Sequence, residues 1–308
     1  MSNKEKFYGI NESNWGHKWG YKDSGFKINS DKSVTFTGKR YPICGKKLYN
    51  FIPFVEEILG VEFALEPKIK EVEEKHVSDP NINESFMADL KKSFDADRFS
   101  SEHNERLLHS HGQHSTDEVY KVLYNRLDQF ADLVFYIESE EETVKLIDLA
   151  EKHNVCLIPY GGGTNVTNAL RPPKEEGRMV VSVDTRRMAT VESVDEQNLM
   201  VTVGAGITGK VLEEELNKRG FTVGHEPDSY EFSTVGGWIS TNAAGMKKHK
   251  YGNIEDIVQN LRMVTPKGVI TQKKPLTRSS FGIKAQNILF GSEGNLGIIT
   301  SATLKVHR

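Results

Sequence analysis

The sequence is poor in cysteine and has no long apolar run. Its two cysteines, Cys44 and Cys156, lie far apart in the chain, and low cysteine use is typical of proteins that do not rely on disulfides. No stretch reaches 18 consecutive apolar residues, so the sequence predicts no transmembrane helix. The first residues lack the apolar segment of a secretory signal, and we expect none.

An excess of one charge is also lacking. The 40 basic and 43 acidic side chains leave a net charge of -3, so bulk electrostatics does not favour nucleic acid as a partner. No glycine loop is followed by the Gly-Lys-Ser/Thr of nucleotide hydrolases. With 308 residues, 37% of them apolar, the chain is long enough for two domains or one large domain with a packed core.

What is present, from residue 132 onward, is an irregular alternation of strand-like and helical segments. Ser139 and Glu142 have the spacing of a capping box. The helix that follows is predicted to bury one face, formed by Thr143, Leu146, Ile147 and Ala150. Strands are expected at residues 133–137, 156–158, 179–183 and 199–203, a helix at 210–219, and a hairpin joining 261–264 to 269–271. This pattern predicts an α+β fold.

The first 127 residues are predicted to form a separate N-terminal region. We expect a strand at 34–37, a helix at 51–59, and a solvated helix or linker over the polar residues 66–106. His109, His111 and His114, with His103 nearby, have the residue type of a zinc site. No cysteine lies near them and the segment is polar, so a solvated loop and no metal are expected.

Two glycine motifs each follow a short apolar run. The first is Pro159-Tyr160-Gly161-Gly162-Gly163-Thr164-Asn165, and the second covers residues 291–300. Glycine allows positive φ and a close approach of the backbone to a ligand, and successive backbone N–H groups can form an anion-binding concavity. The first motif therefore predicts a diphosphate-binding loop, and the second a partner loop closing on the same ligand.

A third glycine pattern, Gly204-x-Gly206-x-x-Gly209, matches the dinucleotide fingerprint literally. It follows a strand, opens a helix and has Glu226 and Asp228 about 20 residues further on. The apolar strand that should carry the acid is short and is broken at residues 224–227. We therefore expect a structural strand–turn–helix here rather than a Rossmann site.

The segment from 224 to 248, together with the two glycine motifs, resembles the flavin-binding domain of the vanillyl-alcohol oxidase / p-cresol methylhydroxylase (PCMH) superfamily. Within it, residues 16–21, 37–42 and 251–256 are similar to the alkyldihydroxyacetonephosphate synthase (alkylglycerone-phosphate synthase) family. The resemblance implies a PCMH-type FAD-binding domain over 128–308, with subdomains of about 128–176 and 177–308. FAD would be held noncovalently, although His225 is the one candidate for a covalent bond beside the cofactor loops.

The resemblance also implies which residues hold the cofactor. They lie in four stretches: Pro159, Tyr160, Gly161, Gly162, Gly163, Thr164 and Asn165; Asp228, Ser229, Tyr230, Glu231, Phe232, Ser233 and Thr234; Thr241, Asn242, Ala243 and Ala244; and Glu293, Gly294, Asn295, Leu296, Gly297, Ile298 and Ile299. For the basic run at 247–250 two interpretations stay open: a solvated turn, or charge that complements a phosphate.

The activity implied is exchange of the acyl chain of acyl-dihydroxyacetone phosphate for a long-chain fatty alcohol, through a flavin N5 adduct, in ether-lipid synthesis. The family also implies a homodimer, peripheral membrane contact without an amphipathic helix in this half, and a peroxisomal or glycosome-like location, with no targeting signal visible. Catalytic residues and a cap domain are expected beyond Arg308, so the isolated chain should be inactive. Two alternatives stay open: an FAD-dependent 2-hydroxy-acid oxidase or dehydrogenase, and a non-catalytic flavin-binding fragment.

Overall fold

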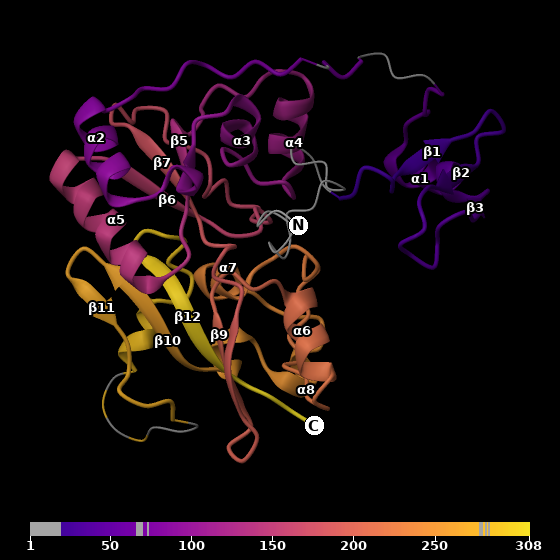
Figure 1. The fold of residues 1–308 in the computed structure, drawn as a ribbon. Coiled ribbons are helices and arrows are strands. Elements are labelled where there is room, and N and C mark those ends of the chain that lie inside the picture. Colours follow the sequence, from indigo (N-terminus) through magenta and orange to yellow (C-terminus); the bar gives the residue numbers. More distant parts are fainter. Residues whose placement is uncertain (1–19, 66–69, 73, 277–279, 281, 283) are drawn as a thin grey trace.

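The computed structural model describes residues 20–65, 70–72, 74–276, 280, 282 and 284–308. Three sheets organise these residues (Figure 1). Part of the 16–21 motif, residues 16–19, lies outside the described residues. Among the described helices, none is long and apolar enough to cross a membrane.

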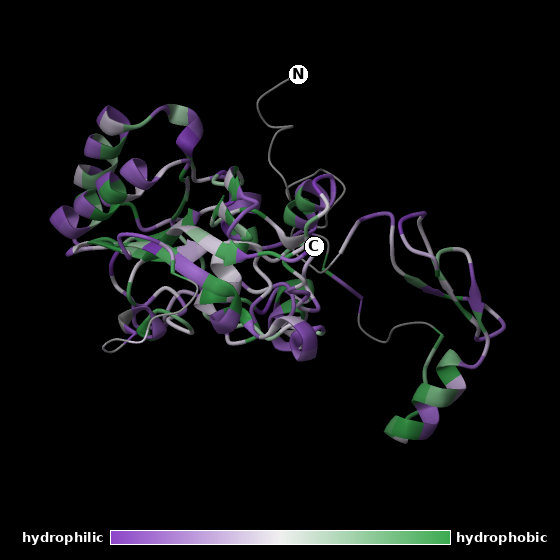
Figure 2. Ribbon diagram, turned by 90° about the horizontal axis from the view of Figure 1, so that it is seen from below, coloured by the Kyte–Doolittle hydropathy of each residue, from purple (hydrophilic) through white to green (hydrophobic). Residues whose placement is uncertain are grey.

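The first sheet belongs to an N-terminal module, residues 20–65. It is antiparallel, in the order β1 (Phe26–Ile28), β2 (Val34–Phe36) and β3 (Lys47–Leu48), and is followed by α1 (Phe51–Leu59). The strand and the helix predicted here are confirmed. Figure 2 shows α1 as a mostly hydrophobic helix standing away from the rest of the chain, and Phe54, Ile58 and Leu59 on it are exposed.

The second sheet has the order β4-β5-β7-β6 and lies in the upper part of Figure 1. Strands β5 (Leu133–Tyr136), β7 (Val180–Asp184) and β6 (Cys156–Tyr160) are parallel, and β4 (Phe99–Ser100) joins antiparallel to β5. The helices around it are α2 (Glu84–Ser93), α3 (His103–Leu108), α4 (Thr116–Leu123) and α5 (Glu140–His153), with a 3-10 turn, η2, at Ala96–Arg98.

Helix α5 forms as its sequence predicts. The Ser139 hydroxyl accepts a hydrogen bond from the Glu142 N–H at 3.1 Å, and the helix ends at Asn154 in the left-handed conformation, φ 53°. All four residues of the predicted core face are buried: Thr143, Leu146, Ile147 and Ala150. Leu146, Ile147 and Ala150 pack into one cluster with residues of the second sheet, among them Leu133, Phe135 and Val181.

Two predictions for the residues before 128 are wrong. Segment 66–106 is not simply solvated, because α2 buries Phe86 and Leu90 completely and lies beside α5 (Figure 1). The segment after α3 is not a solvated loop either, since His109 and His111 are buried. In both cases the burying partner lies far along the chain, so polarity in a local window gives no sign of it.

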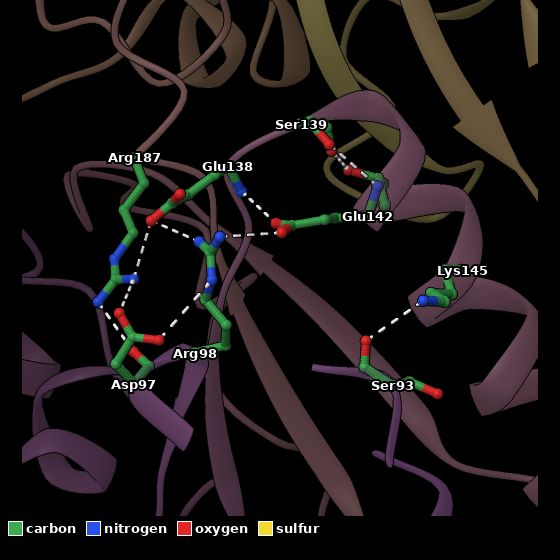
Figure 3. A network of polar contacts seen from close by, with 9 residues as sticks. Ser93, Asp97, Arg98, Glu138, Ser139, Glu142, Lys145 and Arg187 are labelled. Atoms are coloured by element: carbon green, nitrogen blue, oxygen red, sulfur yellow. Dashed lines mark hydrogen bonds and ion pairs between the residues drawn. The ribbon is translucent and has the colours of Figure 1, made fainter. Parts of the chain in front are cut away.

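Ion pairs also join the residues before 128 to those after it. Figure 3 shows Arg98 between Glu138 and Glu142, with its Nη2 at 3.0 Å from the Glu142 carboxylate. Arg187, just after β7, reaches Glu138 at 3.0 Å and donates to the Asp97 carbonyl at 3.0 Å. The division at 127/128 stays a prediction, and these contacts place β4 and η2 firmly on the second sheet.

The third sheet is entirely antiparallel, in the order β11-β10-β12-β9-β8. Its strands are β8 (Val191–Asp195), β9 (Met200–Gly204), β10 (Val258–Thr265), β11 (Gly268–Ile270) and β12 (Ile298–Lys305). Helices α6 (Gly209–Asn217), α7 (Val235–Ser240), α8 (Lys248–Tyr251) and α9 (Ile254–Ile257), and the 3-10 turn η3 (Ala285–Ile288), accompany it. The β10–β11 hairpin is confirmed, whereas β8 and α7 were not predicted.

The topology of this sheet also shows whether the third glycine pattern, Gly204-x-Gly206-x-x-Gly209, belongs to a Rossmann site. Both neighbours of β9 run antiparallel to it, which a Rossmann βαβ unit does not allow. The glycines allow close packing instead: a methyl group at Gly206 would lie 1.9 Å from the Thr185 carbonyl oxygen, and one at Gly209 would lie 2.6 Å from the Trp238 ring. The expectation of a structural strand–turn–helix is therefore confirmed.

Candidate functional site

A cavity of about 480 Å³ opens where the second and third sheets meet. Tyr160 at the end of β6 and Thr185 just after β7 lie on one side of it, and α7 and the loop before β12 lie on the other. Carboxyl ends of parallel strands meet at one edge of a sheet, a common place for ligands. The volume is in the range of small-molecule sites, roughly 300–1,000 Å³.

All but five of the predicted cofactor residues line this cavity. The five are Tyr230, Glu231, Phe232, Asn295 and Leu296. Two of them contact the N-terminal module instead: the Glu231 carboxylate accepts a hydrogen bond from the Tyr41 hydroxyl at 2.8 Å, and Phe232 packs on Tyr21. FAD contact at each of the other positions stays a prediction, but the structure brings the four stretches around one space.

The glycines of the first motif are required by loop packing. A methyl group at Gly162 would lie 2.0 Å from the Phe232 carbonyl oxygen, and one at Gly161 would lie 2.4 Å from the Thr234 hydroxyl. Gly163 has φ +69°, a conformation that favours glycine. Loop 161–163 and loop 232–234 are therefore interlocked, because Thr234 and Phe232 fill the space that side chains at positions 161 and 162 would occupy.

The same loop presents unused hydrogen-bond donors. Among the described residues, no acceptor takes a hydrogen bond from the backbone N–H groups of residues 161–165. Both polar atoms of the Asn165 side chain are also buried without a partner there. Unpaired donors beside a cavity fit an anionic oxygen ligand such as a diphosphate. In the part of the chain that the structure describes, no lysine or arginine lines the cavity, so backbone groups would carry most of this recognition.

A buried polar network supports the loop from behind. The Asp184 carboxylate accepts hydrogen bonds from Arg186 Nε at 3.0 Å and lies 2.9 Å from His109 Nε2. Burial opposes the ionisation of Asp184, but Arg186 and His109 outweigh it and hold the pKa of this carboxyl below its usual range. The Tyr160 ring lies against Arg186 and His109, and burial raises the pKa of Tyr160 to about 12.

His225, the candidate for covalent attachment, does not line the cavity. It is buried against Trp238, with ring centroids 4.9 Å apart, and neither ring nitrogen has a hydrogen-bond partner among the described residues. Burial lowers the pKa of His225 to about 4. A neutral packing residue is the best description of this side chain, and noncovalent binding stays a prediction.

The basic run at 247–250 contributes no residue to the cavity wall. Lys247 forms an ion pair with the Glu226 carboxylate, so its charge is already compensated within the chain. This placement favours the solvated turn over the phosphate-binding interpretation.

Sequence reasoning also missed part of the cavity wall. The additional residues are His114, Val166, Thr167, Ala169, Leu170, Thr185, Pro227, Gly236, Gly237, Trp238 and Ser240. Several directly continue a predicted stretch, and this continuity was a usable signal. Thr185 had none, because it comes to the cavity from an element that carries no glycine motif. His114 lies in the His-rich segment that the sequence analysis singled out, but as a possible metal site and not as part of the cofactor site.

Comparisons with known proteins agree with this geometry. Residues 131–272 match the family described as "FAD binding domain". The sequence is 43% identical to the alkyldihydroxyacetonephosphate synthase of Caenorhabditis elegans over 94% of this chain and 48% of that relative. The enzyme of the same name from Trypanosoma brucei brucei is 35% identical, again over 94% of this chain and 48% of the relative.

A solved structure of alkyldihydroxyacetonephosphate synthase superimposes with a TM-score of 0.85 at 33% identity, covering 97% of this chain and 55% of that one. The chain therefore spans about half the length of the curated relatives it matches. These matches confirm the predicted α+β fold with a PCMH-type FAD-binding domain. By fold, by domain and by identity across nearly its whole length, the chain is a homologue of the alkyldihydroxyacetonephosphate synthases.

Proposed function

We propose that this chain forms the FAD-binding part of an alkyldihydroxyacetonephosphate synthase, which exchanges the acyl chain of acyl-dihydroxyacetone phosphate for a long-chain fatty alcohol. The observation that carries the proposal is the set of unused backbone N–H groups at residues 161–165, which line a cavity together with residues from the other predicted cofactor stretches. The identity to synthases over 94% of the chain supports the choice of reaction.

The residues present fit the cofactor. Residues 161–165 would hold the diphosphate through backbone donors, because the N–H groups of this loop have no acceptor among the described residues. Loop 228–234 and residues 241–244 would form the opposite wall, and residues 293–299 would close the site. When bound, FAD supplies the reactive ring system on which the exchange depends.

The chain's own contribution is orientation. The Asp184–Arg186–His109 network fixes Tyr160 at the end of β6, and Tyr160 leads directly into the glycine loop. The Thr185 N–H and hydroxyl both donate to the Tyr160 carbonyl, at 2.9 and 3.0 Å. A loop held at its root in this way loses little freedom when it binds a ligand, which favours affinity.

Noncovalent attachment is part of the proposal. Cys44, Cys156 and His225 are absent from the cavity wall, and His114 is the histidine that lines it among the described residues. The Tyr160 hydroxyl already lies 3.4 Å from the Gln113 amide. The test is the visible absorption spectrum of the purified chain before and after acid precipitation. Flavin that moves to the supernatant supports noncovalent FAD. Colour that stays with the pellet would contradict it, and a chain that is colourless and cannot be reconstituted would overturn the proposed cofactor.

The lipid part of the proposal extends to membrane contact. Against expectation, one helix does offer an apolar surface: α1 exposes Phe54, Ile58 and Leu59 (Figure 2). Such a surface can lie in the interface of a bilayer without crossing it. A homodimer and a peroxisomal or glycosome-like location complete the proposal by similarity to the family.

The alternative activity, oxidation of a 2-hydroxy acid, can be distinguished from the synthase reaction by whether the substrate reduces the flavin. The reconstituted chain is mixed anaerobically with a 2-hydroxy acid such as D-lactate, and the flavin absorption is followed. A synthase flavin stays oxidised, whereas bleaching followed by recovery in air would favour the oxidase. Exchange itself is tested with acyl-dihydroxyacetone phosphate and hexadecanol, with the C-terminal half of a synthase supplied in trans because the isolated chain is expected to be inactive. Flavin binding without exchange would favour the non-catalytic alternative.

A further inference from the structure

Glu118, in the first turn of α4, is a buried carboxyl outside the cavity wall. Its side chain has no measurable exposure, and neither carboxyl oxygen has a hydrogen-bond partner among the described residues. The neighbouring Asp117 is different, because it is exposed and forms an ion pair with Lys121 at 2.7 Å. An unpaired carboxyl in such a position is costly if it is ionised.

The oxygens near Glu118 increase this cost. A methyl group built on Gly112 would lie 2.7 Å from Glu118 Oε2, 2.7 Å from the Asn165 carbonyl oxygen and 3.0 Å from Asn165 Oδ1. Three oxygens thus surround the space that a methyl group on Gly112 would occupy, and both polar atoms of the Asn165 side chain lack a partner among the described residues. The donors at this place are the Asn165 Nδ2 amide and the Gly112 N–H. An ionised Glu118 could accept from these two but would leave Asn165 Oδ1 without a donor, whereas a protonated carboxyl can also donate to it.

The cluster is directly coupled to the candidate flavin site. Asn165 lines the cavity, and the Gln113 N–H donates to the Gly163 carbonyl at 2.7 Å. The segment between α3 and α4 therefore supports the glycine loop on its outer side. A negative charge on Glu118 would lie behind the loop that is proposed to hold a diphosphate, where it would repel the ligand.

The other charges around Glu118 do not remove this effect. Arg171 is a basic group outside α4 that acts on Glu118, and it already forms an ion pair with Asp128 at 2.8 Å. On α4 itself, Asp117 and Lys121 oppose each other, and His111 is directed to the Gly112 carbonyl. Burial raises the pKa of Glu118, while the Gly112 N–H and Arg171 act in the opposite direction.

We propose that Glu118 is a protonated positioning residue, whose carboxyl O–H donates to Asn165 and holds the glycine loop in the form that binds FAD. The proposal rests on the proposed cofactor. It makes FAD affinity depend on pH: where Glu118 is ionised in the free chain, binding takes up one proton. Affinity then falls by up to about tenfold per pH unit as the pH rises.

The primary variant is Glu118→Gln, which is uncharged at every pH and keeps a donor of similar size. The matched control is Asp117→Asn on the same helix turn. The dissociation constant of FAD is measured by quenching of flavin fluorescence between pH 6 and pH 9. Native protein and Asp117→Asn should lose affinity toward high pH, and Glu118→Gln should bind FAD tightly with no pH dependence.

A second measurement needs no FAD. The folded chain keeps a proton on Glu118 that the unfolded chain loses near pH 4.3, so stability without ligand should fall as the pH rises above about 4.3 until the folded-state pKa is passed. In Glu118→Gln this part of the pH dependence disappears. If Glu118→Gln keeps the native pH profile in both measurements, Glu118 does not carry the proton and the inference is wrong. If instead no variant binds FAD but the stability profile changes as expected, the proposed cofactor fails and the protonation of Glu118 stands.

Discussion

The N-terminal module exposes most of its large apolar side chains, whereas the rest of the chain buries most of them. From Glu84 onward, which we call the body, large clusters around Leu146, Val181 and Trp238 are fully buried. Of the apolar residues of the module, only Tyr21, Val34 and Ile52 are buried, while Phe26, Phe54, Ile58 and Leu59 are each about 60% exposed. Exposed apolar surface of this size marks an interaction site, so the body is stabilised by its own core and the module is shaped for contact.

The comparison predicts that the largest losses of stability come from the body's buried charges. Asp184→Asn removes the partner of Arg186 and His109 inside the protein, and breaking a buried ion pair costs about 3–5 kcal/mol. The free energy of unfolding in urea measures it. In the native chain this contribution is present at neutral pH and is lost as the pH falls below about 4, because the folded-state pKa of Asp184 is depressed. Asp195→Asn, at an exposed position, is the control. Equal effects in both variants would contradict the role assigned to the network.

The second prediction concerns pH. Because His225 is buried with its pKa lowered to about 4, the unfolded chain takes up a proton below about 6.5 that the folded chain does not. Stability should therefore fall by about 3 kcal/mol between pH 6.5 and pH 4 on account of this residue. His225→Gln should make that part of the profile flatter, and the exposed His249→Gln should not. An unchanged slope in His225→Gln would show that His225 is protonated in the folded chain.

A third prediction tests the interlocked loops. Gly162→Ala would place a methyl group 2.0 Å from the Phe232 carbonyl oxygen, so the backbone must move. Overpacking of this kind costs about 1–3 kcal/mol, and FAD binding should weaken at the same time. Gly177→Ala, where nothing lies within 4 Å, should leave thermal stability and flavin fluorescence quenching nearly unchanged. If Gly162→Ala behaves like this control, the two loops are not rigidly packed.

The smallest effect on stability is expected in the module. Ile58→Glu changes an exposed residue on α1, so the free energy of unfolding should change by less than about 0.5 kcal/mol. Cosedimentation with phosphatidylcholine vesicles should nevertheless fall by about tenfold, because an apolar contact is lost. Ile288→Glu is a matched control, since that isoleucine is 68% exposed against 63% for Ile58 but belongs to the body. Equal loss in both variants would remove the special role of α1.

Sequence reasoning succeeded where the determinant is local. Helix α5 carries its own cap at Ser139 and its own buried face, and glycine marks loop 161–163 by its identity alone. Sequence reasoning failed at α7, because Gly236 and Gly237 disfavour a helix. Only the fit of Gly236 against Ala205 and the burial of Trp238 explain why a helix forms there.

The buried histidines show the same limit more sharply. His109 is polar and sits in a polar stretch, and its partner Asp184 is 75 positions away. No window of the sequence contains both residues, so the pairing became visible only with the fold. The same holds for Glu118, whose surroundings come from Gly112 and from Asn165 in the glycine loop.

Strand β12 has a consequence for synthesis on the ribosome. It lies between β10 and β9 in the middle of the third sheet, yet it is the last of these strands in the sequence. Until residues 298–305 emerge, β9 and β10 each keep an open edge, and open edges pair readily with other chains. The same residues bring Ile298 and Ile299 to the cavity. A nascent chain that is still shorter than this would have the candidate flavin site with one wall missing, and chaperone binding should be greatest just before that point.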